Sequence, residues 1–175
     1  NPTYQPNFYN QFNNPALFYK FFKDQLKSVK NFSQIQSNLL LAIQNHQYFP
    51  VQILFNMCRD IIVNECNTSK FGFLRNRVAE YSNPAILSIF LQDPRIDVNK
   101  TPENSNGTAF TLTIWKNLVA SSHILYNTGK VKINQVGQIG ETPLTSCVSA
   151  EHQYPGLIDF LISLQDLDVN AKNKY

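Results

Sequence analysis

Leu167-Asp168-Val169-Asn170 is the stretch of sequence that decides the fold, because its pattern recurs along the chain. Each related stretch places an aliphatic residue one or two positions before an Asn, and the steps between successive Asn residues are 33, 35, 35 and 36 positions. The stretches that share this pattern end at Asn31, Asn64, Asn99, Asn134 and Asn170. A period of this length indicates repeated structural units.

Two further series of residues have nearly the same spacing. Thr142-Pro143-Leu144 is preceded by Thr108-Ala109-Phe110, 34 positions earlier, and by Leu74-Arg75-Asn76, another 34 positions earlier. Prolines form a series with steps of 35 and 34 positions, at Pro15, Pro50 and Pro84. Agreement among three independent series predicts a repeat protein whose units stack on one another.

Each unit is predicted to contain two helices followed by a loop. The last unit carries Leu144, Cys147 and Val148 at the spacing of a one-sided helix, and a more apolar helix follows over residues 157–164. The second helices are expected to begin at or just after a proline, because the first N–H of a helix needs no partner.

Capping residues mark several predicted helix ends. Asn83 and Thr142, each followed by Pro, are expected to accept hydrogen bonds from the N–H groups of the first turn. Gly129 is expected to take the left-handed conformation after a helix. Asn106-Gly107 predicts a tight turn in a loop between units.

Two motifs resemble the ankyrin repeat family. Gly140-Glu141-Thr142-Pro143-Leu144 matches the family pattern G-x-T-P-L, and Asp168-Val169-Asn170-Ala171 matches D-V-N-A, with a shorter match at Asp97-Val98-Asn99. The resemblance implies an all-α repeat fold, an ankyrin-like solenoid of helix-turn-helix units with projecting hairpin loops. The family's His after T-P-L is Thr145 here, so the repeats are divergent.

The predicted organisation has a lead-in, a half-unit and four full units. Residues 1–14 are expected to form a linker or an extended lead-in, and residues 15–31 an N-terminal half-repeat or capping helix. The full ankyrin-like repeats are predicted at 32–66, 67–101, 102–136 and 137–171. Residues 172–175 match the start of a further repeat, so the chain is expected to be part of a longer protein.

The half-unit is predicted to be one helix from Ala16 to Leu26. Its core side would carry Phe18, Phe21, Phe22 and Leu26. Asn13 or Asn14 is expected to cap its start.

Composition argues against several functional classes. The 15 basic and 12 acidic residues give a net charge of only +3, too weak for a dedicated nucleic-acid binder. No run of 18 apolar residues occurs, so no membrane span is predicted. Cys58, Cys66 and Cys147 lack any metal or redox spacing and indicate free thiols in a reducing compartment, so a cytoplasmic location is expected.

The resemblance also implies where a partner would bind. In such stacks the contacts come from residues around the G of G-x-T-P-L and from positions at the end of each first helix. The candidate partner-binding residues are Lys70, Phe71, Phe73, Tyr81, Trp115, Lys116, Gln138, Ile139 and Glu141. The same registers also include Ser82, Asn104, Ser105, Gly107, Ser149 and Ala150.

Four of the candidates would form an aromatic strip along one face: Phe71, Phe73, Tyr81 and Trp115. Aromatic side chains are enriched at binding hot spots because they bury much area with few rotatable bonds. The alternative is that Trp115 and Phe73 are ordinary core residues.

No catalytic, cofactor or metal site is predicted. Cys147 and His152 could be imagined as a nucleophile and its base, but Cys147 falls at the small buried position of a helix. The three histidines are too scattered for a metal site. Asp97 and Asp168 recur at one repeat position, which indicates a shared structural turn rather than an acid and base pair.

The expected function is therefore that of a non-catalytic, monomeric module that binds another protein on the concave face of an ankyrin-like stack. The alternative is the scaffold or substrate-selecting arm of a larger enzyme, or of a bacterial effector acting in a host cytosol, with the catalytic part outside this chain. A further alternative is that the concave face docks on a flanking domain of the same protein.

Overall fold

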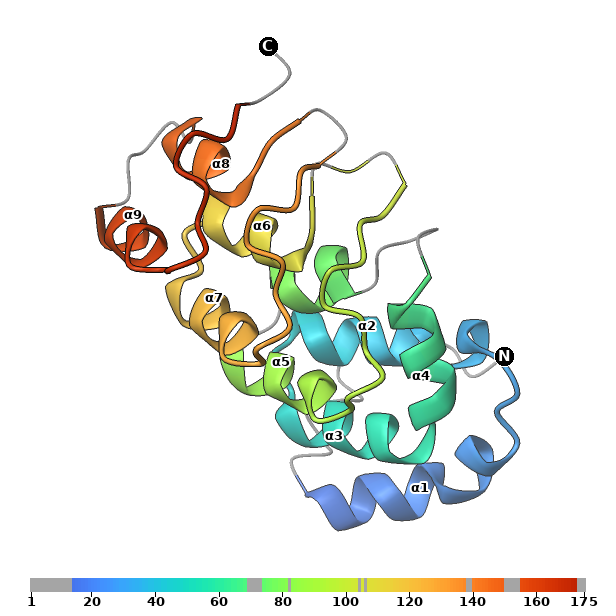
Figure 1. Cartoon of the computed structure of the whole chain (residues 1–175). Helices are drawn as coiled ribbons and strands as arrows, with labels where there is room; N and C mark the ends of the chain where they lie inside the picture. Colours follow the sequence, from blue (N-terminus) through green and yellow to red (C-terminus); the bar gives the residue numbers. More distant parts are fainter. Residues whose placement is uncertain are drawn as a thin grey trace.

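A computed structural model describes residues 14–68, 74–81, 83–103, 105, 107–137, 140–149 and 155–172. All regular structure in these residues is helical, as the sequence predicts (Figure 1). The elements are α1 (Pro15–Lys27), η2 (Phe32–Gln34), α2 (Gln36–Gln44), α3 (Tyr48–Met57), α4 (Arg59–Cys66), η3 (Leu74–Ala79), α5 (Pro84–Leu91), α6 (Ala109–Trp115), α7 (Val119–Tyr126), α8 (Pro143–Ser149) and α9 (Pro155–Ile162). None of these described helices is long and apolar enough to cross a membrane.

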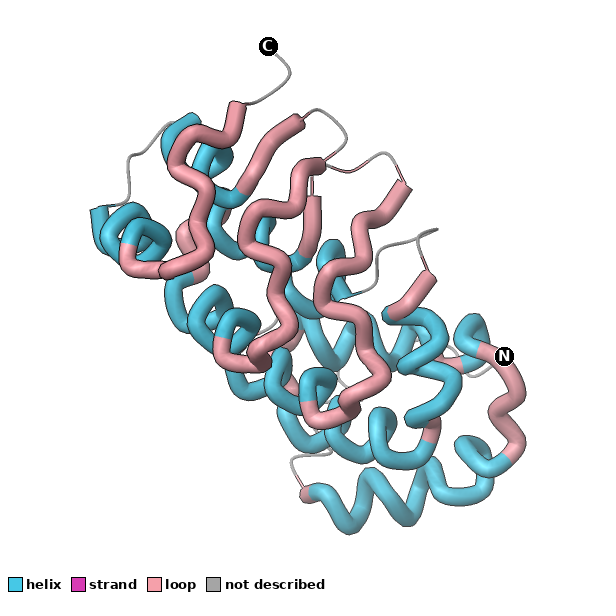
Figure 2. The backbone as a smooth tube through the Cα atoms, viewed as in Figure 1, coloured by secondary structure: helices cyan, strands magenta, loops and turns pink. Residues whose placement is uncertain are grey.

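The helices lie in two layers, and within each layer the elements contact one another in chain order. The first layer contains α2, η3, α6 and α8, and the second contains α1, α3, α5 and α7. Helix α9 lies beside α7, because the ring of Phe160 on α9 meets the ring of Tyr126 on α7 edge-on, with the ring centroids 5.7 Å apart. The loops that follow α5, α7 and α9 run side by side along one side of the molecule (Figure 2).

A continuous apolar core joins the helices. Its largest buried aromatic side chains are Phe18, Phe55, Phe90 and Phe110. In α1, Phe18, Phe22 and Leu26 are buried at helical spacing, which confirms the predicted core side of this helix. The side chain of Phe21 lies outside the described part of the structure.

Side chains cap the helices where the sequence predicts. Asn83 accepts a hydrogen bond from the N–H of Ile86 at 3.0 Å, and Thr142 accepts one from the N–H of Thr145 at 3.2 Å. Of the two candidates before α1, Asn14 forms the cap. These bonds satisfy N–H groups that have no partner within the helix.

Two first-layer helices end in the same way. The N–H of Gln47 reaches back to the carbonyl of Ala42 after α2, and the N–H of Leu118 reaches back to that of Thr113 after α6. Each preceding residue has positive φ, 55° at His46 and 56° at Asn117. This six-to-one bond with a left-handed residue closes a helix and turns the chain toward the second layer.

Glycine takes the left-handed conformation at two predicted positions. Gly129 follows α7 with φ of 68°, as expected for a residue after a helix end. Gly107 has φ of 103°, and a Cβ atom there would lie 2.8 Å from the side chain of Thr111. The turn before α6 therefore requires glycine for both reasons.

The segment after α3 differs from the predicted loop. The repeat pattern predicts that residues 61–64 mark the end of the first unit, after its helices, but they lie inside helix α4. Ile62, Val63 and Cys66 are buried on one side of this helix, and Asn64 is exposed. The helix forms because its apolar residues have helical spacing and find a buried face in the assembled chain.

Three asparagines connect successive loops by the same pair of hydrogen bonds. Asn67, rather than Asn64, is the first of them: its Nδ2 donates to the carbonyl of Arg95 and its Oδ1 accepts from the N–H of Asp97, both at 2.8 Å. A carboxamide can do this because it carries a donor and an acceptor side by side. We call this arrangement the Asn clamp.

The second and third clamps follow along the chain. Asn99 Nδ2 donates to the carbonyl of Lys130 and its Oδ1 accepts from the N–H of Lys132, both at 2.8 Å. Asn134 forms the corresponding bonds with Asp166 and Asp168, at 2.6 and 2.8 Å. Each clamp satisfies backbone groups of a loop about one period further on.

The recurring Asp residues form the predicted structural turn. The Asp97 carboxylate accepts a hydrogen bond from the N–H of Asn99, and the Asp168 carboxylate accepts one from the N–H of Asn170, both at 2.9 Å. Such local bonds stabilise a turn.

A buried carboxylate anchors the loop after α5 to α4. Asp93 is 4% exposed and binds the guanidinium of Arg95 through both carboxylate oxygens, at 2.9 and 2.7 Å. Arg95 also reaches Asp60 of α4 at 2.7 Å, and Arg59 lies 3.6 Å from Asp93. The hydrogen bonds from Arg95 lower the pKa of Asp93 from 3.8 to about 2, although its burial acts in the opposite direction.

This lowered pKa predicts a specific loss of stability in acid. A carboxyl group with a lower pKa in the folded state stabilises the fold above its unfolded pKa, and the contribution is lost as the pH falls from 3.8 to about 2. Asp93→Asn should therefore be less stable than the wild type near neutral pH, and the difference should shrink over that pH range. Urea unfolding of both proteins along a pH series measures it. A difference that stays constant with pH would contradict the assignment.

Candidate partner-binding surface

Tyr81 and Trp115 are exposed aromatic residues at the ends of adjacent first-layer elements. Tyr81 follows η3 and is 40% exposed, and Trp115 ends α6 and is 51% exposed. Because η3 and α6 contact each other, these two ends belong to neighbouring elements of one layer. The alternative that Trp115 is an ordinary core residue is therefore wrong, because half of its side chain is exposed.

Lys116 contacts both of these helix ends. Its ammonium donates to the carboxylate of Glu80 at 2.7 Å and lies 5.8 Å from the centroid of the Trp115 ring. The pair is partly shielded, with side chains 35% and 22% exposed. It therefore joins the end of η3 to the end of α6 and places a cation beside the exposed indole.

Glu141 has a different setting from these three candidates. It lies immediately before α8, where its carboxylate accepts a hydrogen bond from Ser146 Oγ at 3.3 Å and its carbonyl accepts one from the N–H of Gly137 at 2.8 Å. Both bonds join residues that are at most five positions away in the chain, and the side chain of Glu141 is only partly exposed. Its position at a helix start separates it along the chain from the helix ends that carry Tyr81 and Trp115.

Five candidates lie outside the described residues: Lys70, Phe71, Phe73, Gln138 and Ile139. Their part in an aromatic strip or partner surface stays a prediction, and the same holds for Ser82, Asn104 and Ala150. Of the other residues in the same registers, Gly107 is buried, Ser105 donates to the Gly107 carbonyl and Ser149 is exposed.

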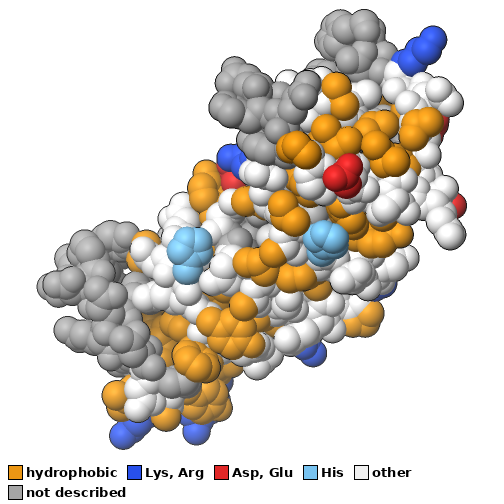
Figure 3. All heavy atoms as spheres, turned by 90° about the vertical axis from the view of Figure 1, so that its left-hand side faces the viewer, with side chains coloured by type: hydrophobic (Ala, Val, Ile, Leu, Met, Phe, Trp, Pro, Cys, Tyr) orange, Lys and Arg blue, Asp and Glu red, His pale blue; other side chains and the backbone are white. Residues whose placement is uncertain are grey.

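The structure adds exposed apolar residues that the sequence analysis missed. They flank the connections between first-layer and second-layer helices: Tyr48, Phe49, Val119 and Val148, all at least 39% exposed. On the side on which α7 and α9 lie, groups of hydrophobic side chains alternate with uncharged polar surface, and few charged side chains are seen (Figure 3). The sequence signal for these residues was their position next to helix ends. Their exposure could not be inferred from it, because they continue apolar runs of the sequence.

The side chains of the three cysteines are buried. Cys58, Cys66 and Cys147 are free thiols, each at most 4% exposed. Burial raises the pKa of all three thiols, and the charge of Glu65 adds to the effect at Cys66. A raised pKa disfavours the nucleophilic thiolate. Cys147 thus occupies the small buried position predicted for it.

The histidines and carboxylates show no metal-binding arrangement in the described residues. The ring of His123 packs on the ring of Phe160, with centroids 4.1 Å apart. His46 is the left-handed residue after α2, and His152 lies outside the described chain.

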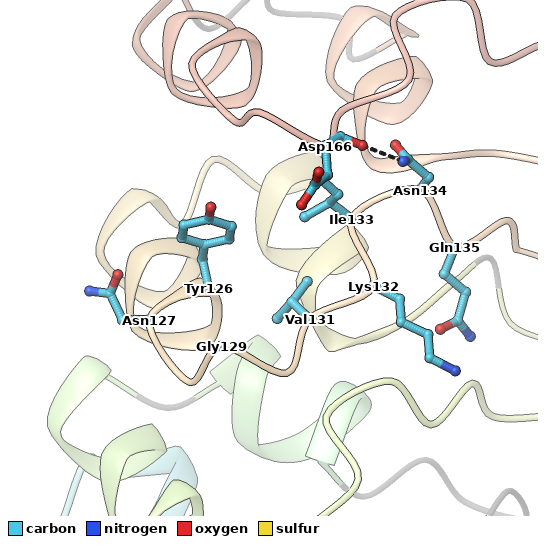
Figure 4. A pocket seen from close by; sticks show the side chains of 9 residues that line it. All are labelled: Tyr126, Asn127, Gly129, Val131, Lys132, Ile133, Asn134, Gln135 and Asp166. Atoms are coloured by element: carbon cyan, nitrogen blue, oxygen red, sulfur yellow. Dashed lines mark hydrogen bonds between the residues drawn. The ribbon is translucent and has the colours of Figure 1, made fainter.

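A groove of about 740 Å³ opens between the loop after α7 and the loop after α9 (Figure 4). Its lining includes Tyr126, Gly129, Val131, Ile133 and Asp166. A smaller groove of about 180 Å³ lies between the loops after α5 and α7. Neither includes Tyr81 or Trp115, so the grooves and the aromatic pair are separate surfaces.

Comparison of the chain with protein-family models, curated proteins and solved structures yields no match. The class that the geometry defines is a two-layered helical protein with an exposed aromatic pair, and the ankyrin resemblance rests on the motifs quoted from the sequence.

Proposed function

We propose that this chain is an ankyrin-like solenoid that binds another protein through its exposed helix ends, without catalysing a reaction. The observation that carries the proposal is the exposed pair Tyr81 and Trp115, joined by the ion pair of Lys116 and Glu80. Two large aromatic side chains and a preorganised cation match the composition of binding hot spots.

Several features support a solenoid. The elements of each layer contact their neighbours in chain order, α2 and α6 end in the same motif, and the Asn clamp occurs three times. Stacked units of one design produce such nearest-neighbour contacts. In this arrangement the ends of η3 and α6 lie on the concave face of the stack.

The surface chemistry supports a protein partner. Tyr and Trp bury large areas for a small loss of conformational entropy, and the ammonium of Lys116 is already held in place by Glu80. Binding would therefore order few side chains. The buried thiols with raised pKa agree with a non-catalytic role.

An alternative function is that of a scaffold or substrate-selecting arm of a larger enzyme or bacterial effector. The same aromatic pair could then dock on a flanking domain of that protein. The full-length sequence separates these cases, because it would show any attached catalytic motif.

Replacement of Trp115 tests the proposal most directly. Trp115→Ala should weaken partner binding by about 1–3 kcal/mol, because truncation of an aromatic hot spot removes most of its buried contact area. Its thermal midpoint should stay within a few degrees of the wild type, because the side chain is half exposed. A large loss of stability would mean that the indole supports the fold instead.

Affinity capture from a cytosolic extract with mass spectrometry would identify the partner. We expect a protein that the wild type retains and that Tyr81→Ala/Trp115→Ala loses. Leu17→Ala/Tyr19→Ala is the matched control, because it removes two exposed side chains from α1. Equal capture by all three folded proteins would exclude the aromatic pair as the binding site.

A further inference from the structure

The two grooves occupy corresponding places in successive units. Their linings share positions that are 35 residues apart: Leu91 and Tyr126, Gln92 and Asn127, Pro94 and Gly129, Ile96 and Val131, Val98 and Ile133. The Asn clamps make Lys130 and Asp166 a further corresponding pair, because their carbonyls accept the bonds from Asn99 and Asn134. The chain therefore holds two versions of one groove.

At the smaller groove a lysine of the chain itself joins the two bordering loops. Lys130 crosses from the loop after α7 and donates from Nζ to the carbonyl oxygen of Pro94 at 2.8 Å. Lys130 and Pro94 both belong to the lining of this groove. The remaining volume is only about 180 Å³.

In the larger groove the same two positions leave the space open. Asp166 replaces the lysine, and a carboxylate cannot donate to the carbonyl of Gly129, because both groups are acceptors. Gly129 also lacks the ring that Pro94 supplies, and no heavy atom lies within 4 Å of a Cβ built on it. The volume of about 740 Å³ falls within the range of roughly 300–1,000 Å³ found for ligand pockets.

We propose that this groove binds a lysine side chain from an extended segment of a partner protein. The incoming ammonium would take the place that Lys130 holds in the smaller groove and donate to the Gly129 carbonyl and the Asp166 carboxylate. Its aliphatic stem would lie against Tyr126, Val131 and Ile133. The aromatic face of Tyr126 adds a favourable setting for a cation.

The groove lining contains two charged side chains, the carboxylate of Asp166 and the ammonium of Lys132. Figure 4 shows the side chains of Tyr126 and Asp166 among those that line the groove, with the side chains of Lys132 and Gln135 extending away from both of them. Within the described residues, Asp166 forms no ion pair, so its carboxylate is available to an ammonium group. A hydrogen bond between charged groups is roughly twice as strong as a neutral one.

The test titrates the isotope-labelled chain with Nα-acetyl-lysine methylamide and follows its backbone amide resonances by NMR. The neutral isostere Nα-acetyl-norleucine methylamide is the matched ligand control. We expect saturable shifts at residues 129–134 and 166 with the lysine probe only. Absence of these shifts at tens of millimolar probe, or equal shifts with the norleucine probe, would overturn the proposal.

Variants of the chain separate the groove from general electrostatic attraction. Asp166→Asn should weaken binding of the lysine probe at least about tenfold, and Asp166→Lys should abolish it while folding normally, because it recreates the lysine of the smaller groove. Asp159→Lys makes the same change of charge at an exposed position of α9 outside the lining. Equal loss of binding in the Asp159 and Asp166 variants would reject a specific site.

The proposed groove is independent of the aromatic pair. Tyr81→Ala/Trp115→Ala should bind the lysine probe as tightly as the wild type, because neither residue lines the groove. If affinity capture showed that the aromatic pair binds no partner, the proposal of a lysine site would still stand. If the lysine probe did not bind, the proposed function of the aromatic pair would still stand.

Discussion

Phe90→Ala should lower the free energy of unfolding by about 3–5 kcal/mol, the largest effect that we expect from a single substitution. Phe90 lies on α5 and is fully buried. Its ring meets the ring of Phe55 on α3 edge-on, with centroids 5.2 Å apart. The substitution would remove this aromatic pair and leave a cavity between two contacting helices of the second layer.

Urea or thermal unfolding measures the effect, with Phe49→Ala as the matched control. Phe49 is the same residue type on α3 but is 51% exposed. Its replacement should change stability by about 0.5 kcal/mol or less, as for other surface positions. Similar losses in the two variants would show that Phe90 does not pack as the structure has it.

Leu161→Ala should cost about 2–5 kcal/mol. Leu161 is fully buried on α9, the last helix of the described chain. Its burial depends on packing against the elements before α9, since a helix of this length has little stability of its own. Loss of the side chain should therefore loosen α9 as well as remove apolar contacts.

Ile162 provides the control for this prediction. It is the next residue on α9 and is 60% exposed, so Ile162→Ala removes a similar side chain from the opposite environment. We expect it to be near neutral in unfolding measurements. If Leu161→Ala were near neutral, or if Ile162→Ala were strongly destabilised, the side of α9 that packs in the core would have been assigned wrongly.

The local features of this chain were predictable from the sequence. Caps such as Asn83 and Thr142 depend on residues within one helical turn, and so do the core side of α1 and the turn at Asp97. Each of these features is decided by bonds or spacings over a few positions. Sequence patterns of that range carry enough information to locate them.

The candidate site was only partly predictable. Repeat register identified Trp115 and Tyr81 as candidates, and the exposed fraction of each side chain came from the structure. Lys116 also came from the register, but its bond to Glu80 spans 36 positions and has no local signal. Glu141 was grouped with them by register, although its side chain bonds Ser146, only five positions further along the chain.

The sequence by itself determined the all-helical class and several helix starts, such as those of α1, α5 and α8, because these follow from spacing and local hydrogen bonding. Only the tertiary structure decided that Asn67 rather than Asn64 clamps a loop, and that Asp93 is buried against Arg95. It also decided that Gly129 and Asp166 line a groove of about 740 Å³, where Pro94 and Lys130 line one of only about 180 Å³. The clamp and the grooves join residues 28 to 36 positions apart, and Asp93 lies against Arg59 of another helix. Their outcome depends on which backbone groups meet when the helices pack, and no short stretch of sequence contains that information.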